Sequence, residues 1–129
     1  MNKGDLKQRI IRRAKELGFD GVGVSKAEPL DAEARYLEAW LNQDKHGKMA
    51  YLANHFEKRV DPRLLVEGAK TIISLSYNYY NPQKQADPTA PKLAMYAYGK
   101  DYHLVVKEKL ELLFDFIKEQ VGELHGRCF

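Results

Sequence analysis

A short polar stretch stands where a tyrosine-rich segment gives way to a strongly apolar-periodic one. In YAYGKDYH (residues 96–103), a glycine and a lysine are followed by Asp101, Tyr102 and His103. An aspartate at such a boundary can cap a helix by accepting hydrogen bonds from its free amides. The start of a helix also suits an anionic or strongly polar ligand, to which Tyr102 and His103 can donate hydrogen bonds or transfer protons. The stretch therefore predicts either a simple helix cap at Asp101 or part of a binding site.

Charged side chains also gather around a proline in FEKRVDPRLLVEGAK, where Lys58, Arg59, Asp61 and Arg63 lie close together. Clusters of this kind are usually solvated, and exposed ion pairs contribute little stability. An arginine beside a proline-fixed turn is nevertheless suited to bidentate contact with a phosphate or amide oxygen. This segment is therefore a second candidate for ligand contact.

The residue types that bind metals are sparse and scattered. His46 precedes a glycine, where a lone histidine is usually a loop residue, and Met49 fits a core position beside Leu52 and Phe56. The only cysteine, Cys128, lies one residue from the end of the chain, so neither a disulfide framework nor a zinc pattern is present. The sequence predicts no metal site.

The first half of the chain reads as helical with one short strand. Apolar residues at helical spacing predict helices over residues 3–17 and 31–42, and a further short helix within 46–59. Asp31 is the expected N-cap of the second helix. Valines that alternate with glycines in FDGVGVS predict a strand between the first two helices.

The second half combines strand patterns with one long helix. Apolar and polar residues alternate over 71–79, and shorter strand patterns cover 92–98 and 126–129. A proline-rich loop separates the first two of these patterns. A three- and four-residue apolar repeat predicts a helix over 101–121. The predicted helices and strands together indicate an α/β (α+β) fold, in which a small sheet packs against helices in a single domain. Because the strand pattern over 126–129 has no continuation, we expect a domain cut from a longer protein.

Composition limits the broad class of protein. The chain has 129 residues, of which 44% are hydrophobic, enough for one domain with one core. The net charge of +3 permits contact with nucleic acid without requiring it. No apolar run approaches the ~20 residues that span a bilayer, and the charged N-terminus lacks a signal peptide's apolar core. We therefore expect a soluble cytoplasmic protein that does not contact membranes.

Two segments, residues 57–80 and 96–113, resemble a known protein family. EKRVDPRLLVEGAKTIISLSYNYY, followed after a proline loop by YAYGKDYHLVVKEKLELL, resembles the N-terminal half of epoxyqueuosine reductase, the cobalamin-dependent iron–sulfur enzyme that completes queuosine in tRNA. The resemblance implies that residues 1–129 form an N-terminal, cobalamin-binding-type α/β domain. It also implies a C-terminal ferredoxin-like domain with two [4Fe-4S] clusters, which this chain lacks. The chain alone is therefore expected to be inactive, and the surface that the other domain would cover is a candidate for self-association.

The resemblance also assigns roles to individual residues. Arg59 occupies the position of an arginine that contacts cobalamin, and Ala94 and Met95 would lie near the corrin. Many members carry an arginine where this chain has Met95, so that polar contact is absent or replaced. Asp101 and Tyr102 would line the pocket on the substrate side, with His103 as the catalytic candidate, while the family's proton-donor aspartate would lie beyond Phe129.

The implied partner is tRNA that carries epoxyqueuosine. A basic face of the first helix could contact its phosphates, although a solvated surface explains the same charges; its members are Lys7, Arg9, Arg12, Arg13 and Lys15. Two alternatives remain open from the residues alone. One is a flavin-binding domain of the nitroreductase type, and the other is an interaction domain without a cofactor; an absorption spectrum would distinguish them.

Overall fold

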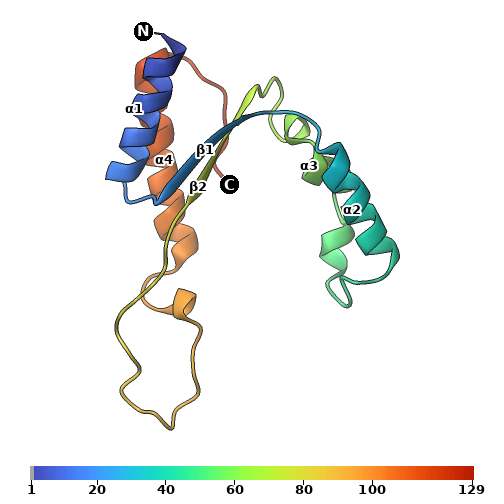
Figure 1. Ribbon diagram of the computed structural model, residues 1–129, viewed down its shortest axis with the longest axis vertical. Helices are drawn as coiled ribbons and strands as arrows, with labels where there is room; N and C mark the ends of the chain where they lie inside the picture. The colour runs from blue at the N-terminus through green and yellow to red at the C-terminus, as the bar shows by residue number, and fades with distance from the viewer. Residues whose placement is uncertain (1) are drawn as a thin grey trace. The chain divides into compact units, whose positions relative to one another are not determined.

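The structure is a computed structural model that describes residues 2–129. Within these residues it contains four α-helices, three short 3-10 helices and two strands (Figure 1). In chain order they are α1 (Lys3–Glu16), β1 (Gly21–Lys26), α2 (Asp31–Asn42), η1 (Ala50–Ala53), α3 (Phe56–Val60), η2 (Pro62–Leu64), β2 (Thr71–Ser76), η3 (Met95–Ala97) and α4 (Tyr102–Val121). The helix and strand content confirms the predicted α+β class, with a smaller sheet than expected.

The two strands pair as one antiparallel sheet. The backbone amide of Asp20 donates to the carbonyl of Ser76 at 2.9 Å, and that of Ala27 donates to Lys70 at 3.0 Å, just outside the two ends of the ladder. The chain divides into two compact units, one running up to Gly23 and resuming over Ser74–Phe129, the other spanning Val24–Ile73.

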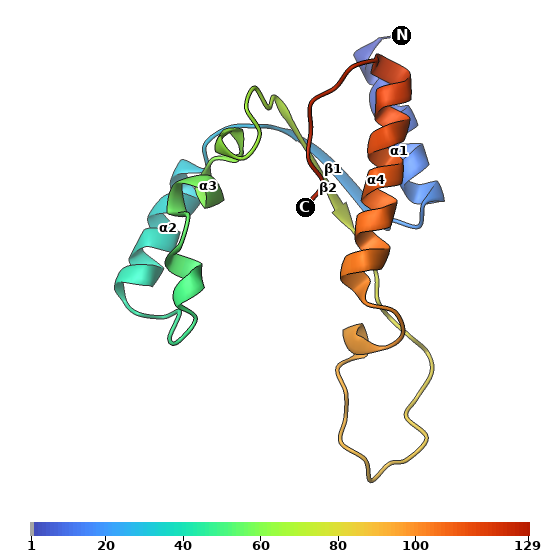
Figure 2. The same cartoon turned by 180° about the vertical axis from the view of Figure 1, so that it is seen from behind.

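In the first unit, α1 and α4 pack side by side, as both views show (Figures 1 and 2). Their contact buries the apolar residues that the helical repeat predicted to face inward; these are Ile10, Ala14, Leu113 and Ile117, joined by Phe19. Lys109 of α4 donates a hydrogen bond to the carbonyl of Leu17 at the end of α1, and its ammonium lies 5.4 Å from the ring centroid of Tyr77. A polar tether therefore joins the two helices next to their apolar contact.

The predicted start and end of α4 are both confirmed. The Asp101 side chain accepts from the backbone amide of His103 at 2.9 Å, which makes Asp101 the N-cap. Gly122 follows the last helical residue with φ 83°, a left-handed conformation that glycine adopts without strain. Beyond it, Gly126 faces the ring of Phe114 so closely that an added Cβ would lie 2.6 Å from the nearest ring carbon. The end of the chain thus runs tightly against α4.

In the second unit, two details differ from the sequence prediction. Leu30, not Asp31, precedes α2 as its cap, because its amide donates to Val60 at 2.8 Å and its carbonyl accepts from Ala34 at 2.8 Å. Asp31 is instead the first helical residue, where its charge still favours the helix start. The single helix expected within 46–59 is split into η1 and α3, and His55 between them has φ 55°.

The sequence overestimated the strand content in three segments. The strand expected over 71–79 ends at Ser76, and the Asn78 amide donates to the Asp20 side chain at 2.7 Å instead of extending the ladder. The strands predicted over 92–98 and 126–129 are wrong, since neither range is a strand in the structure. Residues 95–98 turn instead, with Tyr98 donating to the Met95 carbonyl at 3.1 Å. An extended segment becomes a strand only when a neighbour accepts its hydrogen bonds, and these segments found none within the described chain.

Candidate functional site

The Asp101–His103 turn forms the centre of the candidate site. One carboxylate oxygen of Asp101, Oδ1, lies 2.9 Å from the backbone nitrogen of His103 and 2.9 Å from its ring Nδ1. The hydrogen bond from the His103 backbone, followed by that from its side chain, lowers the pKa of Asp101 below its ordinary value. The His103 side chain is 72% exposed. An ionised carboxylate therefore holds an imidazole that remains open to solvent.

A row of aromatic rings supports this imidazole. The Tyr102 ring stacks on His103 with centroids 4.0 Å apart and planes at 28°. Tyr96 meets Tyr102 edge-on at 5.9 Å, and Tyr79 meets Tyr96 edge-on at 6.4 Å. Edge-to-face contacts at these distances are favourable between aromatic rings. Three separate segments of the first unit are thus linked in series by aromatic contacts, and the last of these contacts is with His103.

The same tyrosines line an open groove of about 320 Å³. Its walls are Tyr77, Tyr79, Tyr96, Tyr102 and Val106, and all four tyrosines are exposed. We call it the tyrosine groove. Tyr77 and Tyr79 fall within the strand predicted over 71–79, and the sequence did not place them in a site. The closely spaced tyrosines of SYNYY and YAY were the available signal, since exposed aromatic side chains often mark binding surfaces.

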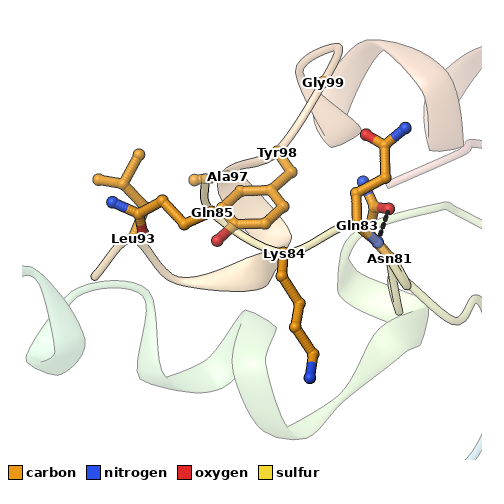
Figure 3. Close-up of a pocket in the computed structure, with 8 residues that line it drawn as sticks. All are labelled: Asn81, Gln83, Lys84, Gln85, Leu93, Ala97, Tyr98 and Gly99. Carbon is orange, nitrogen blue, oxygen red and sulfur yellow. Dashed lines mark hydrogen bonds between the residues drawn. The ribbon is translucent and has the colours of Figure 1, made fainter. Parts of the chain in front are cut away.

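A larger, polar cavity lies in the loop between β2 and η3. It has a volume of about 470 Å³ and is lined by Asn81, Gln83, Lys84, Gln85, Leu93, Ala97, Tyr98 and Gly99 (Figure 3). Asn81 Oδ1 accepts from the Gln83 amide at 3.0 Å, and the Gln85 side chain donates to the Pro91 carbonyl at 2.8 Å. Lys84 extends away from the other labelled side chains (Figure 3). The side chains of Asn81 and Gln85 therefore stabilise the shape of the loop.

The two residues expected near a corrin lie at η3. Ala94 is exposed and precedes the 3-10 turn, and Met95 is half-buried within it. The Met95 sulfur accepts from the backbone amide of Asn81 at 3.3 Å. Met95 therefore anchors the loop through its sulfur, a role that a charged guanidinium would not fill in the same way.

Arg59, in the second unit, already makes two hydrogen bonds within the protein. Its Nε donates to the carbonyl of Asn54 at 2.9 Å, and Nη2 donates to that of Tyr51 at 3.0 Å. These bonds hold η1 and the turn before α3. A guanidinium has five N–H donors, so the contacts leave others for a ligand. The expectation that Arg59 and the Asp101–His103 turn border one concavity stays a prediction.

Asp61 and Arg63 form an ion pair within the charged cluster around Pro62. Arg63 Nη2 lies 2.7 Å from Asp61 Oδ2, and its Nε also donates to the same carboxylate. The side-chain bond from Arg63 lowers the pKa of Asp61 below its ordinary value and raises the pKa of Arg63. Asp61 also caps η2 by accepting from the Arg63 amide. Because each charged group has its partner within the pair, the turn around Pro62 favours a structural role over ligand contact.

Metal-ligating groups do not cluster within residues 2–129: no set of three or more His, Cys, Asp or Glu is placed to hold an ion. The ring of His46 lies beside Trp40, with centroids 5.8 Å apart. Met49 is exposed and not in the core position that the sequence suggested. Burial raises the pKa of the Cys128 thiol, which makes it a poorer ligand at neutral pH.

The chain is similar in sequence and fold to known proteins of one family. Residues 59–129 match the family described as "Epoxyqueuosine reductase QueG, DUF1730". The epoxyqueuosine reductase of Leadbetterella byssophila is 54% identical over 125 residues, covering 97% of this chain and 41% of the relative. The solved epoxyqueuosine reductase from Streptococcus thermophilus superposes with a TM-score of 0.79 at 28% identity, covering 92% of this chain and 33% of that one.

A second solved relative was determined together with a nucleic acid. It is an epoxyqueuosine reductase with a tRNA-Tyr epoxyqueuosine-modified tRNA stem loop, with a TM-score of 0.72, 32% identity and coverage of 92% of this chain and 32% of that one. The chain thus spans less than half of the length of these relatives. The resemblance carried by the KRVDPRLLV and GKDYH segments is confirmed, and the chain belongs to the epoxyqueuosine reductase family.

Proposed function

We propose that this chain forms the N-terminal, cobalamin-binding part of an epoxyqueuosine reductase, which removes the epoxide oxygen of epoxyqueuosine in tRNA. The observation that carries the proposal is the Asp101–His103 pair: the family's GKDYH segment is folded into a polar turn that stands open beside the tyrosine groove. Family membership favours this reading over a flavin-binding domain or an interaction domain without a cofactor.

The residues present suit a corrin in their chemistry. A corrin offers broad apolar faces and a rim of amide groups, which match exposed tyrosine rings and unused arginine donors respectively. Tyr102 is 43% exposed, and Arg59 retains donors beyond its two bonds to backbone carbonyls. We propose Arg59, Ala94, Met95, Asp101 and Tyr102 as the contacts. When bound, cobalamin supplies redox-active cobalt; this chain would bind and orient it.

Iron–sulfur clusters do not fit the residues of this chain. A [4Fe-4S] cluster takes four cysteine thiolates, and the chain has one cysteine. The two clusters of the proposed reductase would therefore be held by residues outside these 129. Without that electron source, the chain alone is expected to be inactive.

The proposed partner is tRNA, by analogy with the solved relative that holds a tRNA stem loop. Of the basic face on α1, Lys7, Arg12 and Lys15 are exposed, whereas Arg13 pairs with Glu16 at 3.4 Å. Binding through these charges would weaken as salt rises. No helix within residues 2–129 combines the length and apolarity needed to cross a bilayer. A tRNA substrate favours a cytoplasmic location, and self-association of the chain stays a prediction.

A chimera tests the proposal. These residues would replace the matching segment of the Leadbetterella byssophila reductase in a bacterium without its own enzyme, and tRNA nucleosides would be measured by mass spectrometry. We expect queuosine in place of epoxyqueuosine, and accumulation of epoxyqueuosine when His103→Ala is introduced. A soluble, cofactor-loaded chimera that leaves epoxyqueuosine unchanged would contradict the proposal.

Cobalamin binding provides a direct second measurement. Hydroxocobalamin would be titrated into the chimera and followed by the change in its visible spectrum. Arg59→Gln should weaken binding, whereas Arg63→Gln should not, because Arg63 is occupied by Asp61. Equal affinities for the two variants would remove Arg59 from the proposed cofactor contacts.

A further inference from the structure

The Asp101 carboxylate does more than a helix cap requires. A cap needs only the bond from the backbone amide, yet the same Oδ1 also contacts ring Nδ1 of His103, both at 2.9 Å. We propose that Asp101 is a positioning residue: it fixes His103 as the Nδ1–H tautomer and so leaves Nε2 as a hydrogen-bond acceptor on a ring that stacks against Tyr102, a residue of the tyrosine groove.

The tautomer follows from which partner can donate. An ionised carboxylate has only acceptor sites, and an aspartate is ionised at neutral pH even with its ordinary pKa, which the bonds from His103 lower further. A contact of 2.9 Å is therefore a hydrogen bond only if Nδ1 carries the proton. A neutral imidazole carries one N–H, so the lone pair is left on Nε2.

The aromatic row restricts the ring further. Tyr102 covers one face of the imidazole, and Tyr96 and Tyr79 brace Tyr102 in turn by edge-on contacts. Rotation of the His103 side chain would break both the bond to Asp101 and the stacking on Tyr102. Nε2 has no hydrogen-bond partner within residues 2–129, and the side chain is 72% exposed. Asp101 thus restrains the ring at Nδ1 and Tyr102 restrains it on one face, while the acceptor nitrogen Nε2 stays available to a ligand.

This arrangement selects a class of ligand group. A neutral Nε2 accepts from a hydroxyl or an N–H and cannot hold an unprotonated oxygen, which would instead need a donor. The nearby groove offers apolar ring faces. We therefore expect a ring-bearing group with a hydroxyl or amine to be bound here. This choice of ligand class rests on the proposed function, whereas the assignment of the His103 tautomer does not.

Nitrogen chemical shifts test the tautomer on the chain as it stands. In protein labelled with ¹⁵N-histidine, long-range proton–nitrogen spectra above neutral pH distinguish a protonated from an unprotonated ring nitrogen. We expect His103 to show a protonated Nδ1 and an unprotonated Nε2, while the other three histidines serve as internal references. A predominant Nε2–H form in the wild-type chain would overturn the inference.

The variant Asp101→Ser separates capping from positioning. Serine caps helices about as well as aspartate, so α4 should be retained, but its neutral, shorter side chain cannot hold Nδ1–H as a carboxylate does. The His103 signals should move toward the Nε2–H form that free histidine prefers. The matched control is Asp87→Ser, which removes a carboxylate that similarly accepts two bonds, from Thr89. If Asp101→Ser and Asp87→Ser leave His103 equally unchanged, the inference fails.

Activity of the chimera gives an independent readout. Asp101→Ser should lower turnover about tenfold or more while thermal unfolding stays close to that of the parent, because positioning of a proton-handling group acts on the rate. Asp87→Ser should not lower it. A parent chimera without activity would count against the proposed function alone, whereas full activity of Asp101→Ser would count against the role given to Asp101.

Discussion

Lys109 is expected to be the strongest polar contributor to the packing of α4 on α1. Its ammonium donates to the carbonyl of Leu17, which lies at the end of α1 where carbonyls lack helical partners. The same ammonium lies 5.4 Å from the ring centroid of Tyr77. Replacing Lys109 by methionine removes both contacts but keeps a long apolar side chain and a similar helix propensity.

The magnitude follows from these two contacts. A hydrogen bond from a charged donor contributes about 1.5–3 kcal/mol, and a partly exposed cation–π contact about 0.5–1 kcal/mol. Because Lys109 is only half-buried, water and salt screen both contacts and reduce their contribution to stability. We therefore expect Lys109→Met to lower the free energy of unfolding by about 1.5–2.5 kcal/mol. With a denaturant dependence typical of small domains, the urea midpoint should fall by about 1–2 M.

The matched control is Lys107→Met on the exposed side of the same helix. It makes the same chemical change and should alter the free energy of unfolding by no more than about 0.5 kcal/mol. Urea titrations followed by far-ultraviolet circular dichroism would compare both variants with the parent chain. Equal midpoints for Lys109→Met and Lys107→Met would refute the tether between α1 and α4.

Three further outcomes follow from packing and charge. Leu113→Ala should destabilise the chain by about 2–4 kcal/mol in urea titrations, and its neighbour Leu112→Ala by less than about 1 kcal/mol, because Leu113 is 3% exposed and Leu112 46%; similar losses would disprove the assigned core. Gly126→Ala should cost about 1–3 kcal/mol in the same assay, since its methyl group collides with a ring of α4, and an unchanged midpoint would show that this contact does not persist in solution. Arg63 holds the pKa of Asp61 below 3.8, so the stability from this carboxylate is present above about pH 4 and lost as pH falls through the lower folded pKa. Arg63→Gln should raise that pKa toward 3.8, measured by carboxyl carbon shifts, and an unaltered pKa would contradict the assigned cause.

The sequence predicted the long helices well because their signals are local. The apolar repeat of α4, its cap at Asp101 and its end at Gly122 all lie within one continuous segment. The strands over 92–98 and 126–129 were mispredicted because alternation reports only that one face could be buried. Whether a partner strand is available depends on the whole fold, and the described sheet has two strands.

The candidate site was predicted in its members and not in its geometry. Asp101 and His103 were identified from residue types at a helix start, yet the shared contact of one Asp101 oxygen with the backbone nitrogen and ring Nδ1 of His103 depends on side-chain rotamers. Tyr79 and Tyr96 were missed because their contacts bridge segments on either side of a long loop. Arg59 was expected to face a ligand, and its bonds to Tyr51 and Asn54 depend on the left-handed turn at His55.

The placement of the single tryptophan gives the chain a built-in optical reporter. Trp40 lies in the second unit, on α2 and beside His46. Its emission should therefore register the unfolding of that unit alone. Circular dichroism, by contrast, is dominated by α1 and α4 of the first unit. Superimposable fluorescence and dichroism transitions would mean that the two units melt cooperatively, whereas separated transitions would reveal a half-folded species in which one unit persists without the other.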